Sequence, residues 1–243
     1  MNLNFKLKII FMNNHLLIKK RLRYTKFIGL IIARLPYIGC VILTGSLARG
    51  NANQNSDIDI MIIARAGRIF SARFFVNTFG TIFGMKRSKD ETKNHAGKFC
   101  FNYFVSDNYL MLPTGRGEKI DRYCAEDYSR SKFMAGDYQL HEEFLYKNRK
   151  LFNQYGHSIK LDRFTPTHQC VNINRQTPYT TSRFERWVRQ YQIRKIESDP
   201  ITKKYPNLIV YNDKELRFHP PSLKLRRTSP PKKRGPILRK ERA

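Results

Sequence analysis

Two aspartates one residue apart give this sequence its clearest sign of chemistry. Asp57 and Asp59 stand in the run SDIDIMIIA, whose apolar side chains are typical of a buried strand. Side chains in a strand repeat every two residues, so both carboxylates and Met61 point to one face. Such a pair can hold two Mg²⁺ ions that bridge phosphate oxygens, and Mn²⁺ is possible in their place. Because Asp-x-Asp is common by chance, its meaning depends on its neighbours.

A Gly-Ser pair precedes the aspartates, at the end of the apolar run GCVILT. Glycine lets the main chain come close to a ligand, and a turn opening into a helix exposes backbone N–H groups beside the Ser46 hydroxyl. Arg49 follows and either clamps a phosphate through two parallel N–H bonds or lies on a helix surface. Gly45, Ser46 and Arg49 are therefore the candidate nucleotide-binding residues.

The combined stretch GSLARGNANQNSDIDI resembles the signature of the DNA polymerase β-type nucleotidyltransferase superfamily. That pattern is Gly-Ser, a short helical turn with a glycine, and then Asp-x-Asp. A weaker likeness, to uncharacterised prokaryotic nucleotidyltransferase-domain proteins, extends to about Tyr155 and includes the late RFHP. The resemblance implies an NTP substrate, with Gly45 and Ser46 on its β- and γ-phosphates and with Asp57 and Asp59 as catalytic residues and Mg²⁺ ligands.

One departure concerns a third carboxylate, which active members of the superfamily usually carry on a later strand. The expected strand KFCFNYFVSD has no acid in mid-strand on the face formed by Lys98, Cys100, Asn102, Phe104 and Ser106. Asn102 occupies the expected position, and its amide can ligate a metal but cannot act as a base. Asp107 at the strand end is the nearest replacement, and Glu91 in the preceding loop is a remoter one.

Hydrophobic periodicity supplies the elements that must position these residues. A helix is expected from about His15 to Leu35, where Pro36 ends it, followed by strands over GCVILTGS and SDIDIMIIA. A second apolar helix is expected over residues 65–85 and an aromatic strand over 98–107. Residues 119–155 have a helical pattern that breaks near Ala135 and Gly136. With the resemblance, these elements predict an α+β fold: a small mixed β-sheet flanked by helices.

The same patterns of composition and periodicity divide the chain into four parts. We expect an N-terminal extension (1–13), a nucleotidyltransferase core (14–112), a mainly helical C-terminal region (113–218) and a basic tail (219–243). The tail contains nine Lys or Arg, five Pro and one Glu, a composition that cannot bury a core and predicts disorder. In the C-terminal region, RFERWVRQYQIRKI is expected to form a basic amphipathic helix. Trp187 in that helix is either a packing anchor or a platform for stacking bases.

Charge points to a polyanionic partner or a phosphate substrate. Forty-six Lys and Arg oppose nineteen Asp and Glu, giving a formal net charge of +27 in 243 residues. Such a surface favours large polyanions such as RNA or tRNA as the acceptor, although a solvated basic surface without a dedicated partner is the alternative.

Several classes of protein are disfavoured by the sequence. The four cysteines form no CxxC pair, so neither a zinc site nor a disulfide framework is indicated, and a cytoplasmic location is expected. The N-terminal apolar stretch contains lysines and lacks a cleavage site, which is unlike a signal peptide. FIGLIIARLPYIGCVIL is interrupted by Arg34 and Pro36, so it predicts a helix, a turn and a strand, and no membrane partner.

Three functional hypotheses remain open from the residues. The first is an enzyme that moves an NMP from an NTP to an unidentified acceptor and releases pyrophosphate. The second is a catalytically weak or inactive module of the same fold that binds nucleotide or nucleic acid, which Asn102 and the net charge favour. The third is a basic scaffold that binds RNA only through its tail.

Overall fold

A six-stranded mixed sheet organises the computed structural model, which describes residues 3–88, 94–114, 118–159, 182–204 and 209–218, with side chains from Asn14 onward. The strand order is β4-β1-β2-β3-β6-β5. The elements in chain order are α1 (Leu3–Ile32), β1 (Ile38–Thr44), α2 (Gly45–Arg49), β2 (Ile58–Ala64), α3 (Ile69–Ile82), β3 (Phe99–Ser106), α4 (Glu118–Ser129), β4 (Lys132–Gly136), α5 (Tyr138–Gln154), α7 (Arg183–Glu197), α8 (Pro200–Lys204), β5 (Val210–Tyr211) and β6 (Glu215–Arg217).

The central strands are buried on both faces. β1 and β2 are antiparallel, β2 and β3 are parallel, and every residue of β1 and β2 is buried. β4 adds to the free side of β1, and the β5–β6 hairpin adds to β3, both antiparallel. The predicted α+β class and mixed sheet are confirmed.

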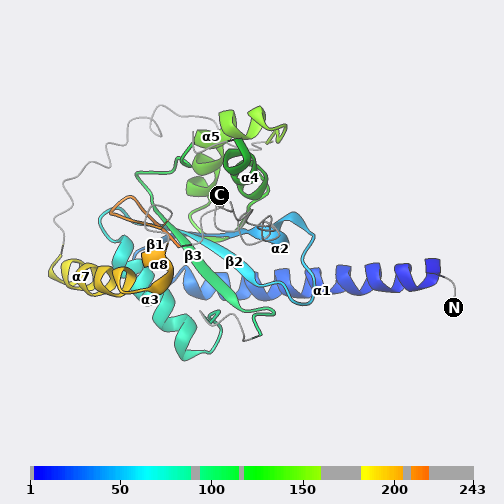
Figure 1. Ribbon diagram of the computed structural model, residues 1–243, viewed down its shortest axis with the longest axis horizontal. Helices are drawn as coiled ribbons and strands as arrows, with labels where there is room; N and C mark the ends of the chain where they lie inside the picture. The colour runs from blue at the N-terminus through cyan, green and yellow to red at the C-terminus, as the bar shows by residue number, and fades with distance from the viewer. Residues whose placement is uncertain (1–2, 89–93, 115–117, 160–181, 205–208, 219–243) are drawn as a thin grey trace, which may run out of the picture.

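Two helical layers enclose the sheet (Figure 1). One apolar cluster joins α1, α3 and α7 to the sheet through side chains such as Ile32, Phe70, Val188 and Phe104. The other joins α4 and α5 to the opposite face through Cys124, Phe144 and Phe152, among others. The residues that carry the motif lie between these layers. They occupy the connection that leaves the end of β1, passes through α2 and enters the start of β2.

The structure differs from the expected elements at one short segment. Residues predicted as a break between helices form β4, which pairs with β1 in the register Cys40↔Gly136. Gly136 has φ +93° and approaches the backbone so closely that a Cβ there would meet the Gly39 carbonyl oxygen at 2.5 Å. Five residues of mixed polarity carry too little periodicity to be identified as a strand before their partner is known.

α1 is longer than expected, since it begins at Leu3 and therefore runs through the predicted extension. Ala33 to Tyr37 form the expected turn before β1. Within the described residues, no helix combines the length and the apolar character that crossing a bilayer would require. The tail predicted to be disordered lies outside the described residues.

A buried carboxylate fastens α7 to the start of α3. Glu185 is 3% exposed, and its two carboxylate oxygens accept hydrogen bonds from the backbone N–H groups of Phe70 (3.0 Å) and Ser71 (2.9 Å). The first N–H groups of a helix lack partners within the helix, so a carboxylate from another element satisfies them and completes α3. Gln192, two turns further along α7, donates to the Phe70 carbonyl (2.8 Å).

Replacing Glu185 should therefore loosen α7 from the core. We expect Glu185→Ala to lower the free energy of unfolding by about 3 kcal/mol, because two buried charge-assisted hydrogen bonds are lost and two N–H groups are left unpaired. Glu197→Ala on the exposed side of the same helix should change it by less than about 0.5 kcal/mol. Equal denaturant midpoints for the two variants would contradict this account of α7.

Candidate functional site

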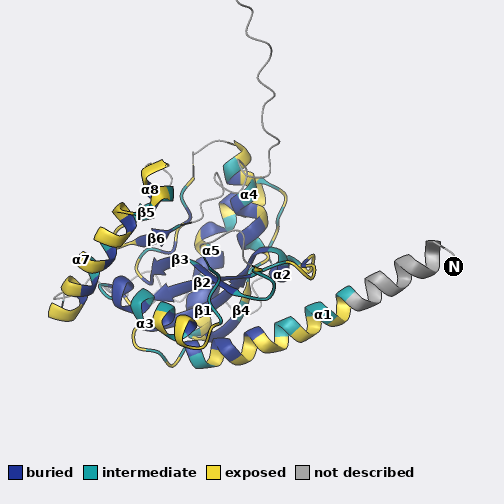
Figure 2. Ribbon diagram, turned by 60° about the horizontal axis from the view of Figure 1, so that its bottom comes forward, coloured by how far each residue is buried: buried dark blue, intermediate teal, exposed yellow. Residues whose placement is uncertain are grey.

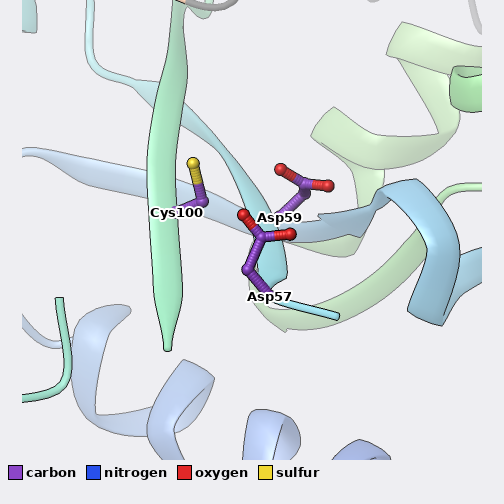
Figure 3. Close-up of side chains that lie close together, drawn as sticks. All are labelled: Asp57, Asp59 and Cys100. Carbon is purple, nitrogen blue, oxygen red and sulfur yellow. The ribbon is translucent and has the colours of Figure 1, made fainter. Parts of the chain in front are cut away.

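The paired aspartates lie at the start of β2, and the Gly-Ser turn lies beside them at the end of β1. Thr44, the last residue of β1, is the partner of Asp59 in the antiparallel ladder. Gly45 and Ser46 follow at once and begin α2, so the two halves of the motif meet across the β1–β2 pair. Figure 3 shows the carboxylates of Asp57 and Asp59 close to one another, as the two-residue repeat predicts.

Position 45 requires a glycine. Its φ is +72°, and a Cβ built on it would meet the Oδ2 atom of Asp59 at 2.2 Å. No other residue can bring its backbone so close to that carboxylate without moving it. The glycine of the turn and the second aspartate of the pair therefore form one packed unit.

Cys100 is the third member of the cluster. It lies opposite Asp59 in the parallel β2–β3 ladder, and one ligand atom each from Asp57, Asp59 and Cys100 lie within 4.8 Å of one another (Figure 3). Two carboxylates are ligands that Mg²⁺ and Mn²⁺ accept, whereas a thiolate favours softer ions such as Zn²⁺. The donor set therefore fits a divalent ion at the two aspartates, with the Cys100 sulfur beside them.

Asn102 is the second neutral residue beside the pair. Its side-chain amide donates to the Asp59 Oδ1 atom at 3.4 Å. The β2–β3 register shifts here, since Ile60 pairs with Phe101 but Met61 pairs with Tyr103, and Asn102 is left as the extra residue. A bulge of this kind re-aims one side chain and reverses the alternation beyond it. Phe104, predicted to share the face of Asn102, instead packs in the cluster with Phe99 and Phe101.

Arg87 neutralises the first aspartate. Its guanidinium donates to the Asp57 Oδ2 atom at 2.6 Å, and the two side chains are 22% and 20% exposed. Burial lowers the pKa of Arg87, whereas Cys100 and Asp57 beside it raise that pKa. Their combined effect is larger than that of burial, so the pKa of Arg87 lies above its usual value. Arg87 reaches the site from the loop after α3, and its place in the sequence gave no sign of this role.

Arg49 is turned away from the candidate site. Its guanidinium donates to Asp127 on α4, and Glu126 lies 4.0 Å from its Nε atom. To bind a phosphate as predicted, the Arg49 side chain would therefore have to break a partly buried ion pair with Asp127. Arg49 in this structure fastens α2 to α4.

Asp107 lies at the opposite end of the strand pair from the cluster. Its backbone N–H donates to the Ala64 carbonyl (2.8 Å), five residues beyond Asp59 along β2, which is about 16 Å at the usual rise. Its carboxylate accepts from the Ala66 N–H (2.9 Å) and from Arg65 (3.4 Å), so it stabilises the turn into α3. Glu91, the other candidate acid, lies outside the described residues.

A cavity of about 420 Å³ opens beside the cluster. At one end it is lined by Arg87, Cys100 and Asn102, and it extends between α3 and the α7–α8 segment to Tyr191, Lys195 and Ile201. Phe99, Phe101 and Phe218 supply apolar walls, while Arg73, Lys86, Arg87 and Lys195 supply positive charge and Asp199 supplies one negative charge. Its chemistry suits a ligand that combines a flat ring with phosphate groups.

Comparison with known proteins agrees with the motif. Residues 26–102 match the family described as "Nucleotidyltransferase domain", a span that includes β1, α2, β2, α3 and the Asn102 position. Residues 26–102 are therefore similar to nucleotidyltransferase domains, as the resemblance implied. No curated protein matches the chain.

One solved structure is similar at a low level. Its description is "Crystal structure of the toxin-antitoxin with AMP-PNP", and the alignment covers 54% of this chain and 86% of that one. The sequence identity is 19% and the TM-score is 0.29. A likeness of this size has no bearing on the ligand or the partners of this protein.

The close contact at Gly45 gives a test with a matched control. Gly50→Ala should lose about 1 kcal/mol of stability because its φ is positive, and Gly45→Ala should lose at least as much, since its Cβ must also displace Asp59. Only the Cβ at Gly45 meets a carboxylate, since that at Gly50 has nothing within 4 Å. Isothermal titration with Mg²⁺-ATP should therefore show binding at least tenfold weaker for Gly45→Ala alone. Equal Mg²⁺-ATP affinity of the two variants would contradict the placement of Gly45 in the nucleotide-binding site.

The Arg87 ion pair gives a second test, read by thermal unfolding. Arg87→Gln removes the guanidinium that pairs with Asp57, so we expect a loss of about 1 kcal/mol in metal-free buffer. Added Mg²⁺ should then raise the unfolding temperature more than it does in the wild type, because the ion supplies the missing charge. Arg122→Gln removes an exposed ion pair with Glu118 and should leave the Mg²⁺ response unchanged. An identical Mg²⁺ response in all three proteins would refute the assignment.

Proposed function

We propose that this protein is a metal-dependent nucleotidyltransferase, which moves an NMP from an NTP to an acceptor and releases pyrophosphate. The observation that carries the proposal is the contact between Gly45 and the Asp59 carboxylate. It puts the turn that we propose binds phosphate next to the aspartates that we propose bind the metal. The match to the nucleotidyltransferase domain over residues 26–102 supports it independently.

The reaction is an in-line substitution at the α-phosphorus of the NTP. An acceptor hydroxyl oxygen forms a new bond to that phosphorus, the bond to the bridging oxygen of the β-phosphate breaks, and the hydroxyl proton passes to water or to the pyrophosphate. Bound Mg²⁺ would neutralise charge on the phosphate oxygens and lower the barrier. Positioning and charge supply most of the catalysis in reactions of this class.

The chain's own residues divide this work. Asp57 and Asp59 would hold the divalent ions, two of Mg²⁺ by expectation, and Gly45 and Ser46 would receive the β- and γ-phosphates. Arg87, which pairs with Asp57 and lines the cavity, would supply a guanidinium to a phosphate of the bound nucleotide. Arg49 would take part only after leaving Asp127, so we assign it to positioning α2.

A specific observation favours the alternative function, which is a weak or inactive module that binds nucleotide. Cys100 and Asn102 stand next to the aspartates, where a carboxylate would take the proton from the acceptor. Without that base the acceptor must lose its proton to solvent, which predicts slow turnover rather than none. ATP among the four NTPs, RNA or tRNA as the acceptor of this basic protein, and a cytoplasmic location stay predictions.

Pyrophosphate release distinguishes the two functions. The wild type should release pyrophosphate from at least one NTP with Mg²⁺ or Mn²⁺ when total RNA and a metabolite mixture are present. Asp57→Asn and Asp59→Asn should each reduce the rate by more than about a hundredfold, because each removes a metal ligand. Asp213→Asn, at an exposed position on the β5–β6 turn, should keep the wild-type rate.

Two results would contradict the enzymatic assignment. Full activity in either site variant would show that the aspartates are not the metal ligands, provided that circular dichroism finds both variants folded. Binding of NTP by the wild type without any release would establish the alternative function.

A further inference from the structure

The outer face of α7 carries an aromatic stripe that the proposed function does not yet use. Phe184, Trp187 and Tyr191 follow one another at helical spacing and are 39%, 58% and 50% exposed. The rings of Trp187 and Tyr191 lie 6.1 Å apart and nearly parallel, at 11°, and Phe184 continues the row at 6.2 Å from Trp187. Figure 2 shows this outer side of α7 as exposed. Trp187 is therefore no packing anchor.

Positive charge flanks the stripe. Arg194 and Lys195 are exposed and, with Trp187, Gln190 and Tyr191, line a shallow hollow on the helix. Arg183 and Arg186 are exposed nearer its N-terminal end. Flat rings in a row beside guanidinium and ammonium groups are the features with which proteins hold single-stranded nucleic acid. Bases stack on the rings, and the cations meet the phosphates between them.

The hollow adjoins the cavity beside the candidate active site. It shares Tyr191 and Lys195 with the larger cavity between α3 and α7, and that cavity ends at Arg87, Cys100 and Asn102. Arg87 and Asn102 in turn donate hydrogen bonds to Asp57 and Asp59. Basic and aromatic side chains therefore extend from the stripe to the residues that contact the paired carboxylates.

We propose that the acceptor is single-stranded RNA, held by its bases on Trp187 and Tyr191 and by its phosphates at Arg194 and Lys195. Its terminal nucleotide then enters the cavity, and the terminal hydroxyl is the group that attacks the NTP. RNA is favoured over DNA because unpaired ends and loops are its ordinary form, whereas the bases of duplex DNA are not free to stack. The binding surface stands by itself, and only the attack by the terminal hydroxyl rests on the proposed function.

The test uses the intrinsic fluorescence of the full-length protein, because Trp187 is the single tryptophan in the chain. A stacked base quenches an indole, so titration with a short unstructured RNA oligonucleotide should lower Trp187 emission in step with binding measured by anisotropy of labelled RNA. Inorganic polyphosphate carries the charge without bases, so it should bind without quenching. The titration needs neither metal nor NTP, so it is independent of catalysis.

Each outcome bears on the proposal. RNA binding without quenching, or equal quenching by polyphosphate, would overturn the stacking surface. A single-stranded DNA of the same sequence that quenches with equal or higher affinity would overturn the assignment to RNA. Quenching by RNA alone supports both.

Variants supply the second measurement. Trp187→Ala/Tyr191→Ala should bind the RNA at least about tenfold more weakly, since two stacking contacts are lost. Phe27→Ala, an equally exposed aromatic on α1, should bind like the wild type. Asp57→Asn should also keep RNA binding while losing pyrophosphate release, so that failure of the surface and failure of the active site give different results. Unchanged RNA affinity in the aromatic double variant would overturn the proposal.

Discussion

The contact between the Gly45 backbone and the Asp59 carboxylate is the constraint on which the rest of the site depends. It exists because β1 and β2 pair with Thr44 opposite Asp59, which delivers the turn and the carboxylate to the same point. A shift of one residue in that register would turn the aspartates into the apolar layer of α1 and α3. The complete burial of both strands prevents this shift, because every residue in them has a fixed place in one of two cores. The chemistry of the site is therefore held by the packing of the sheet.

Charge compensation is the second organising element. Two adjacent carboxylates, one of them 7% exposed, need positive charge or hydrogen-bond donors beside them. Arg87 and Asn102 provide these, one to each aspartate. The Cys100 sulfur lies within 4.8 Å of one oxygen of each carboxylate. The guanidinium of Arg87 thus stands beside both the aspartates and the cavity that it lines.

The sequence identified the two aspartates, the glycine turn and the central strands because each depends on local spacing: alternation in β2, an apolar run in β1, and a glycine between them. It could not identify Arg87, whose position depends on the loop after α3 pairing with Phe99, the first residue of β3. The bulge at Asn102 was likewise hidden, since KFCFNYFVSD alternates without interruption in the sequence and shifts only against β2. β4 was missed because a five-residue edge strand is defined by its partner. The ion pair of Arg49 could not be foreseen because its partner, Asp127, is 78 residues away. Features fixed by short-range pattern were predictable, whereas those fixed by long-range pairing were not.

The β5–β6 hairpin has a consequence for how the chain acquires its structure. β6 pairs with β3 across more than a hundred residues, and Glu215 accepts a hydrogen bond from the buried Tyr103 hydroxyl at 3.3 Å. Until β6 leaves the ribosome β3 has an open edge, and until α7 leaves it α3 lacks its carboxylate cap from Glu185. Contacts so distant in sequence make folding slow, because a long loop must close before they form. The motif is thus translated early but reaches its final surroundings late, and the nascent chain passes through a stage with an exposed strand edge that chaperones would have reason to cover.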